Sequence, residues 1–207
     1  MNEKGRVAVF LSGRGSNFVS LYRDSLKTGA NFRIEAVVCD RKKAPGLKKA
    51  KRFGIPAYLL SHCEFSSQAE YEKKMIDLLK QHRIDLICLA GYMRIVGESL
   101  LRRYPNRIMN IHPALLPAFA GLHAQKQALD HGAKASGCTV HFTDAGTDTG
   151  PIILQRAVAV REGDDEETLS RRILKQEHRA YPSAVRLFFS GRLTVVGRRV
   201  LISENEK

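Results

Sequence analysis

The sequence predicts an α/β fold, a mostly parallel twisted sheet with helices on both faces and antiparallel additions near the C-terminus. Short runs of β-branched and aliphatic residues alternate with segments of helical periodicity through the first half of the chain. One run, Asp85–Ala90, is almost continuously apolar, which is typical of a parallel strand covered on both faces. The connections are short, so successive parallel strands are expected to be joined by right-handed crossovers.

The first half is expected to alternate strands with helices in chain order. Its predicted strands are Arg6–Leu11, Phe32–Cys39, Ala57–Leu60, Asp85–Ala90 and Ile108–His112. Its predicted helices are Phe18–Leu26, Gly46–Phe53, Gln68–His82 and Glu98–Arg103. The third of these helices has apolar residues at helical spacing, which indicates that one face is buried.

The second half has a different pattern. Strands are expected at Ser136–Phe142 and Ile152–Val160, on either side of the polar, glycine-rich loop Thr143–Gly150. A long helix follows at Thr168–Phe189, and Pro182 is expected to kink or divide it because proline removes a backbone donor. A terminal hairpin is predicted from Arg192–Val196 and Arg199–Ile202 around Gly197. With no linker or repeat, we expect one domain over residues 1–207.

Composition limits the classes of function. Of the 207 residues, 43% are hydrophobic and 27% are charged, which supports a buried core and argues against disorder. The net charge of +13 favours anionic partners such as phosphorylated metabolites, polycarboxylates, nucleic acid or an anionic membrane surface. No apolar run approaches the ~18–20 residues that cross a bilayer, and no secretory signal is recognisable. We therefore expect a cytoplasmic protein that does not associate with membranes.

Metal and disulfide chemistry are not expected. The cysteines Cys39, Cys63, Cys88 and Cys138 form no CxxC pair, and two of them, Cys39 and Cys88, lie in apolar runs typical of core residues. The histidines show no HExxH motif, and His141 in its alternating strand is expected to be structural.

A basic cluster follows the second predicted strand and continues into the next helix. Its members are Arg41, Lys42, Lys43, Lys48, Lys49, Lys51 and Arg52. Only Phe53 adjoins it as a platform on which a base could stack, so a solvated helix face is expected rather than a nucleic-acid surface.

The segment Ser12–Asn17 (SGRGSN) joins the first predicted strand to a helix. Glycines allow a ligand to approach the backbone, and a helix N-terminus presents unpaired N–H groups to an anion. The spacing lacks the third glycine of dinucleotide sites, since Phe18 stands there, and it lacks the GK[ST] of a P-loop. It suits a small phosphate monoester. The alternative is a tight turn in which Ser16 or Asn17 caps the helix.

Polar residues mark the end of the last strand in the first half. Asn110 and His112 point to one side of this strand, and Pro113 ends it at the edge where open α/β sheets bind ligands. An amide beside an imidazole can stabilise an oxyanion and move a proton. The alternative is that both side chains only satisfy loop backbone.

An acid is expected to complete this group. Asp148, in the glycine-rich loop, can fix the tautomer of His112 and favour its imidazolium form, although aspartate is also a common turn residue. Asp144 is the competing acid, but it follows the strand directly and is interpreted as a loop-initiating residue. Neither Ser16 nor Cys138 has an evident base partner, so a covalent acyl-enzyme is not expected.

Together these motifs resemble the phosphoribosylglycinamide formyltransferases of the folate-dependent formyltransferase family, over nearly the whole chain from Val7 to Leu201. The segments that carry the resemblance are SGRGSN at Ser12–Asn17, LAGYMRIV at Leu89–Val96, NIHPALLP at Asn110–Pro117, Gly121-Leu122-His123, Asp148-Thr149-Gly150-Pro151 and Gln176-Glu177-His178.

The resemblance implies a Rossmann-like fold and transfer of a formyl group from 10-formyltetrahydrofolate to the amine of 5-phosphoribosylglycinamide, a step of purine synthesis. It implies the catalytic set Asn110, His112 and Asp148. The implied ribonucleotide contacts are Gly15, Ser16, Asn17 and Glu177, and the implied folate contacts are Gln68, Met93, Arg94, Ile95, Val96, Asn110 and Asp144. Residues 1–106 would then form a phosphate-binding half and residues 107–207 a catalytic and folate-binding half, in a monomer or homodimer with small-molecule substrates and no metal.

The chain departs from the family at several positions. Gln68 stands where an arginine often lies near the folate glutamate tail. Further departures are Ala118, Ala120, Ala145 and Thr147, which bear on folate affinity rather than on the reaction.

Three rival interpretations remain. Methionyl-tRNA formyltransferase carries an extra C-terminal domain, and formyltetrahydrofolate deformylase carries an extra N-terminal domain. We expect no room for either domain in this chain. A non-catalytic phosphate-binding or RNA-binding module would not require the polar set Asn110, His112 and Asp148.

Overall fold

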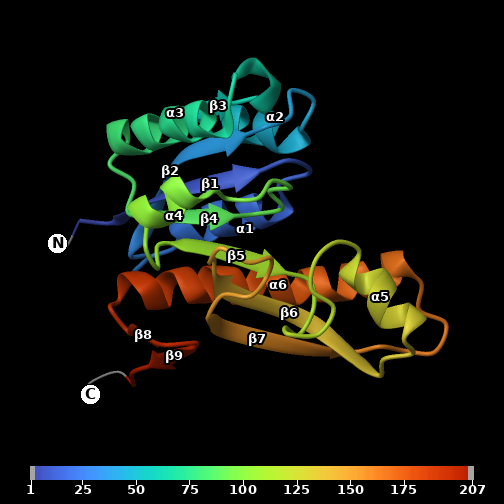
Figure 1. Cartoon of the computed structure of the whole chain (residues 1–207). Coiled ribbons are helices and arrows are strands. Elements are labelled where there is room, and N and C mark those ends of the chain that lie inside the picture. The colour runs from blue at the N-terminus through green and yellow to red at the C-terminus, as the bar shows by residue number, and fades with distance from the viewer. Residues whose placement is uncertain (1–2, 205–207) are drawn as a thin grey trace. The chain divides into compact units, whose positions relative to one another are not determined.

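The structure is a computed structural model that describes residues 3–204. The chain divides between Met109 and Asn110 into two compact units, each with its own sheet region and helices (Figure 1). No helix within residues 3–204 is long and apolar enough to cross a membrane.

The first unit contains parallel strands in the order β3-β2-β1-β4. These are β1 (Gly5–Leu11), β2 (Phe32–Cys39), β3 (Ala57–Leu59) and β4 (Leu86–Leu89). The helices are α1 (Ser16–Ser25), α2 (Pro45–Arg52), α3 (Gln68–Gln81) and α4 (Glu98–Arg103), with a short 3-10 helix at His62–Glu64.

Helices cover both faces of these parallel strands. Phe10 and Ile87 face a buried cluster to which α3 contributes Tyr71 and Leu79 and α4 contributes Leu100. On the opposite face, α1 and α2 pack against β2. Because both faces are buried, these strands are apolar at nearly every position, as the sequence predicted. The cysteines form no disulfide within residues 3–204, and Cys39 and Cys88 lie in this core as expected.

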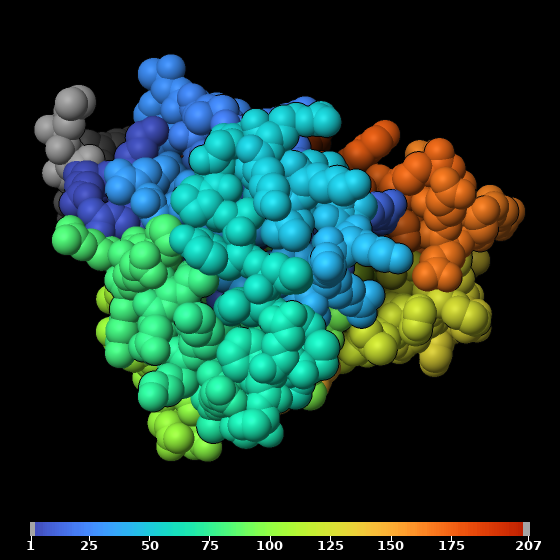
Figure 2. All heavy atoms as spheres, turned by 90° about the horizontal axis from the view of Figure 1, so that it is seen from above, coloured from blue at the N-terminus to red at the C-terminus, as the bar shows by residue number. Residues whose placement is uncertain are grey.

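The basic cluster lies on the surface of the first unit. Figure 2 shows one face of the molecule on which residues of α2 and α3, coloured from light blue to turquoise, are exposed. Apart from the half-buried Lys49, whose Nζ donates to the carbonyl of Arg14 at 2.8 Å, the cluster is exposed to solvent. It forms a solvated surface, as expected from the sequence.

The second unit carries the antiparallel additions. Its strands lie in the order β5-β6-β7-β9-β8, and β6 pairs with β7, and β8 with β9, in antiparallel fashion. The strands are β5 (Ile108–His112), which begins just before the division, β6 (Ala135–Phe142), β7 (Ile152–Ala159), β8 (Leu193–Val196) and β9 (Arg199–Ile202). The helices are α5 (Ala124–Asp130) and α6 (Glu166–Phe189), and α6 packs along β6 and β7. The predicted fold class is confirmed.

The helices differ from the sequence expectation in three respects. Helix α6 is not divided at Pro182 but runs unbroken through it, because proline removes one donor while a buried apolar face, including Ile173 and Val185, holds the helix against the sheet. Helix α1 begins at Ser16 rather than Phe18. Helix α5 was missed because it has only seven residues and buries little more than Ala124 and Ala128.

Gly137 in β6 tests the close pairing of β6 with β7. A Cβ atom there would overlap the carbonyl oxygen of Arg156 and lie 2.8 Å from Leu115 Cδ2. Gly137→Ala should lower the free energy of unfolding by about 1–3 kcal/mol, measured by urea denaturation. Gly13→Ala, which meets no atom within 4 Å, is the control. An equal loss in both variants would show that the overlap is not the cause.

Candidate active site

Strand β5 carries the two polar side chains of the predicted site, Asn110 and His112, near its carboxyl end. Asn110 and His112 point to one face, and the intervening Ile111 is buried on the other. The strand ends at His112 because Pro113 offers no backbone donor to continue the ladder. The side chain of His112 is only 5% exposed, so it needs defined polar partners.

The loop between β6 and β7 supplies the acid. Asp148 has a φ of 55°, a left-handed conformation that aspartate tolerates better than most residues. Asp144 accepts hydrogen bonds from Thr149 Oγ1 at 2.6 Å and from the Gly146 amide at 3.1 Å. Asp144 therefore stabilises the loop, as the sequence suggested, and Asp148 is the acid that reaches β5.

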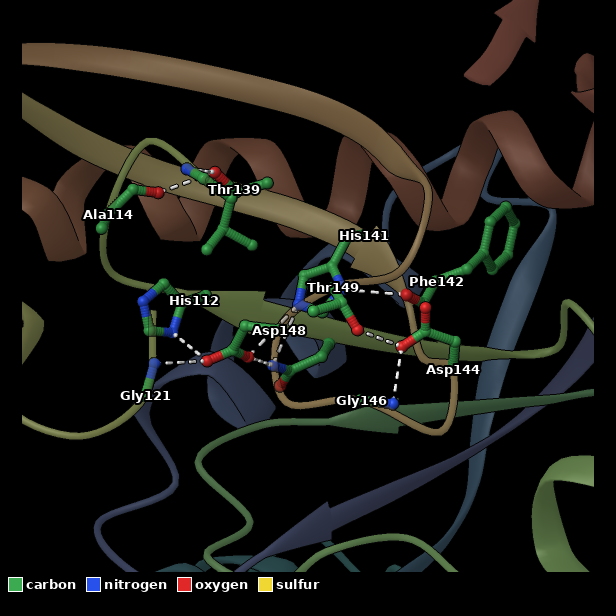
Figure 3. Close-up of polar contacts among 12 residues, drawn as sticks. His112, Ala114, Gly121, Thr139, His141, Phe142, Asp144, Gly146, Asp148 and Thr149 are labelled. Atoms are coloured by element: carbon green, nitrogen blue, oxygen red, sulfur yellow. Dashed lines mark hydrogen bonds and ion pairs between the residues drawn. The ribbon is translucent and has the colours of Figure 1, made fainter. Parts of the chain in front are cut away.

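The Asp148 carboxylate contacts His112, Asn110 and the backbone of Gly121 (Figure 3). Its Oδ2 lies 3.1 Å from His112 Nδ1 and accepts the Gly121 amide at 2.9 Å. Its Oδ1 accepts a hydrogen bond from Asn110 Nδ2 at 3.1 Å. The predicted catalytic residues are thus in direct contact.

The environment favours a charged pair. Burial by itself would raise the pKa of the Asp148 carboxyl, but hydrogen bonds from His141 and Gly121 outweigh it. Together with the positive charge on the two histidines, they bring this pKa below its ordinary value of 3.8. His112 Nε2 lies 2.8 Å from the carbonyl oxygen of Phe119, which can only accept. Since both ring nitrogens of His112 face acceptors, the imidazolium form satisfies both.

His141 of β6 belongs to the same network. Its Nδ1 donates to the carbonyl of Phe142 at 2.8 Å, and its Nε2 lies 3.2 Å from Asn110 Nδ2 and 3.6 Å from Asp148 Oδ1. A neutral ring accepts from Asn110, and a protonated ring donates towards Asp148. The sequence interpretation of His141 as structural missed this contact, although its alternation in β6 with Thr139 was a usable signal. The roles of Phe119 and Gly121 were also missed, because backbone atoms leave no motif.

The glycine-rich loop lies in the first unit. Gly15 is the N-cap of α1 with a φ of 68°, and a Cβ there would lie 2.8 Å from Gly46 Cα. Ser16 and Asn17 form the first turn of α1, so the alternative in which one of them is the N-cap is wrong. The loop thus places three of the expected phosphate contacts, Gly15, Ser16 and Asn17, at a helix N-terminus.

The segment Met93–Val96 follows β4 in the same unit. The Met93 amide donates to Ser12 Oγ at 2.9 Å, which ties the segment to the glycine-rich loop. Met93 and Ile95 are 56% and 79% exposed, whereas Val96 is buried. Arg94 lies over the ring of Tyr71, and its buried Nε has no hydrogen-bond partner within residues 3–204.

Two further predicted contacts lie on helices. Gln68 opens α3, where it donates to Glu72 Oε1 at 2.7 Å and its Oε1 lies 3.1 Å from His62 Nε2. Glu177 lies on α6 in the second unit and is buried. In the described part of the chain, no three His, Cys, Asp or Glu residues are grouped so that they could hold a metal ion.

A buried imidazole with a half-buried amide and a half-buried carboxylate, at a strand end of an open α/β sheet, is typical of an enzyme that transfers a group at a carbonyl carbon. Comparisons with known proteins identify the family. The pattern of the formyl transferase family matches residues 5–185. The chain therefore belongs to the formyl transferase family, and the predicted resemblance is confirmed.

The relatives specify the branch of the family. The chain is 42% identical over 181 residues to phosphoribosylglycinamide formyltransferase of Bacillus subtilis, covering 87% of this chain and 93% of the relative. The structure resembles that of glycinamide ribonucleotide transformylase 1 from Symbiobacterium toebii, with a TM-score of 0.94, 48% identity and coverage of 99% and 96% of the two chains. The sequence of this chain is also 48% identical over 191 residues to the trifunctional purine biosynthetic protein adenosine-3 of Drosophila pseudoobscura pseudoobscura. This match covers 91% of this chain but only 14% of that protein.

The lowered pKa of Asp148 predicts a pH dependence of stability. A carboxyl whose folded pKa is depressed stabilises the fold above its unfolded-state pKa, and this contribution is lost as the pH falls through the folded value. Asp148→Asn should therefore destabilise the protein most near neutral pH, and the difference should shrink in acid. Urea denaturation of both proteins across this range measures it. A difference that is the same at every pH would show that the Asp148 charge contributes nothing.

Proposed function

We propose that this chain transfers the formyl group of 10-formyltetrahydrofolate to the amine of 5-phosphoribosylglycinamide in purine synthesis. The observation that carries the proposal is the contact of Asp148 with both His112 and Asn110, at 3.1 Å in each case. The names of the Bacillus subtilis and Symbiobacterium toebii relatives support the choice of acceptor.

His112 contributes its charge. In its imidazolium form the His112 ring donates to the Asp148 carboxylate and to the Phe119 carbonyl, and these two contacts hold the ring in one orientation. In a buried setting, where the dielectric constant is low, this fixed positive charge stabilises negative charge that develops on a formyl oxygen nearby.

Asn110 contributes a donor. Its amide nitrogen carries two hydrogens, which face Asp148 and His141. One of these bonds would be exchanged for the formyl oxygen during transfer. His141 and Asp148 hold the Asn110 amide in one orientation, so that the exchange of hydrogen bonds needs only a small movement of this side chain.

Asp148 holds the His112 imidazole in place. As the substrate amine bonds to the formyl carbon, the bond from that carbon to the folate nitrogen breaks, and the proton that the amine loses passes to this departing nitrogen. The pKa of Asp148 is depressed, so its carboxylate stays ionised at neutral pH and keeps its negative charge beside His112. In the proposed transfer no covalent bond forms between the enzyme and the substrate.

The formyl-folate supplies the one-carbon group, and the residues of the first unit fit such a ligand. Met93 and Ile95 expose apolar side chains suited to a flat aromatic ring system, and the Arg94 guanidinium suits a carboxylate. We propose that Met93–Val96 and Gln68 bind the folate and that Asp144 is a further folate contact. The Ser16 and Asn17 turn binds the substrate phosphate, and Glu177 binds the ribonucleotide.

Small-molecule substrates, a cytoplasmic location and a monomeric or dimeric state complete the proposal. We propose that residues 1–106 form the phosphate-binding half and residues 107–207 the catalytic and folate-binding half, with Gln68 and Met93–Val96 as folate contacts from the first half. Nucleic acid is not among the proposed partners, because the exposed basic cluster offers little more than charge.

An absorbance assay of folate product with the ribonucleotide as acceptor tests the activity. Asn110→Ala removes one donor to the developing charge and should lower kcat about 10²–10³-fold. Gln81→Ala, on the exposed end of α3, should retain wild-type kcat. Failure of the wild type to form product at high enzyme concentration would overturn the proposed function.

Ser16→Ala tests the phosphate loop separately. Loss of one hydrogen bond to a charged group should raise KM for the ribonucleotide about tenfold and leave KM for the folate unchanged. Thr28→Ala, in the exposed turn after α1, is the control. Equal changes in both KM values would mean that the loop supports the fold and does not bind phosphate.

A further inference from the structure

The segment 113–123, here called the 113–123 loop, joins β5 to α5 and contacts the catalytic pair through its backbone. Its Phe119 carbonyl accepts from His112, and its Gly121 amide donates to Asp148. Phe119, Gly121 and His123 all have positive φ values, of 55°, 82° and 58°. Because side chains other than glycine rarely adopt this conformation, the loop depends on outside contacts to hold it.

Thr139 of β6 holds the first part of the loop (Figure 3). Its hydroxyl is fully buried and donates to the carbonyl of Ala114 at 2.7 Å. It also accepts the Leu116 amide and Gln155 Nε2, both at 3.0 Å. One donor and two acceptor positions are the full capacity of a hydroxyl, so this contact point is saturated.

Two glutamine side chains also donate hydrogen bonds to the backbone of the 113–123 loop. Gln155 Nε2, from β7, donates to the Leu116 carbonyl at 2.8 Å as well as to Thr139. Gln127 Nε2, from α5, donates to the carbonyls of Leu122 at 2.9 Å and Ala120 at 3.2 Å. Each amide nitrogen therefore uses both of its hydrogens on acceptors, one glutamine at each end of the loop.

We propose that Gln155 and Gln127 are positioning residues that fix the 113–123 loop so that Phe119 and Gly121 hold His112 and Asp148 in their hydrogen-bonded orientation. Within residues 3–204 the side-chain hydrogen bonds of both glutamines go to the 113–123 loop and to Thr139 rather than to the catalytic residues. Both are long side chains at or near the surface, and ordering such side chains costs rotamer entropy, so their paired contacts are what keeps them in place. The expected effect on catalysis rests on the proposed function, whereas the effect on the loop does not.

The test uses Gln155→Met and Gln127→Met, which keep an unbranched side chain of similar length but remove the donors. Gln125→Met is the matched control, since Gln125 lies on the same helix and makes no side-chain hydrogen bond within residues 3–204. Circular dichroism and the thermal midpoint establish that each variant is folded.

The first measurement is hydrogen exchange of the Gly121 amide in the full chain, by NMR. Each glutamine variant should reduce its protection at least about tenfold, because the loop opens locally, while core amides such as that of Val9 stay protected. The control should match the wild type. Unchanged protection of Gly121 in both glutamine variants would overturn the proposal, whatever the activity of the protein.

The second measurement is kinetic. Each glutamine variant should lower kcat about tenfold to a hundredfold with little change in either KM, because a small displacement of an oriented group is costly for the reaction. The double variant should lose less than the product of the single losses, because both residues hold one loop. A multiplicative loss, or a gain in kcat, would contradict the proposal. Absence of product in the wild type would instead reject the proposed function and leave the exchange test valid.

Discussion

The contact of the Asp148 carboxylate with the His112 imidazole is the interaction on which the site depends. Both side chains are nearly buried, at 11% and 5% exposure, where an unpaired charge would be costly. The pair is tolerated because every polar atom has a partner: Asn110 and Gly121 donate to the carboxylate, and Phe119 accepts from the ring. Removing one partner would leave a buried charge unsatisfied, which is why the whole arrangement behaves as a unit.

This arrangement explains how loops, rather than helices or strands, complete the chemistry. Strand β5 supplies two side chains with the precision of a pleated backbone. Apart from His141 of β6, the other partners come from two irregular segments, the loop of Asp148 and the 113–123 loop, which can adopt the left-handed conformations of Asp148 and Phe119. A rigid sheet with adaptable loops at its edge is the usual solution for α/β enzymes.

Much of the fold followed from the sequence. Parallel strands covered on both faces must be apolar throughout, so the apolar run from Asp85 to Ala90 correctly predicted β4. The polar strand end at Asn110 and His112 was equally visible, since proline and alternation define it. Pro182 does not divide α6, because burial of this helix on its sheet outweighs one missing hydrogen bond.

The sequence by itself thus determined the order and type of most elements, the family and the side chains with chemical capacity. The choice of Asp148 over Asp144 as the partner of His112 was also predicted, and the structure has that contact. Only the tertiary structure decided that His141 joins Asn110 and that the backbone of Phe119 accepts from the ring. The physical reason is that periodicity and motif depend on side chains close in sequence. Hydrogen bonds between distant segments, above all those made by carbonyl and amide groups that every residue carries, leave no mark in the sequence.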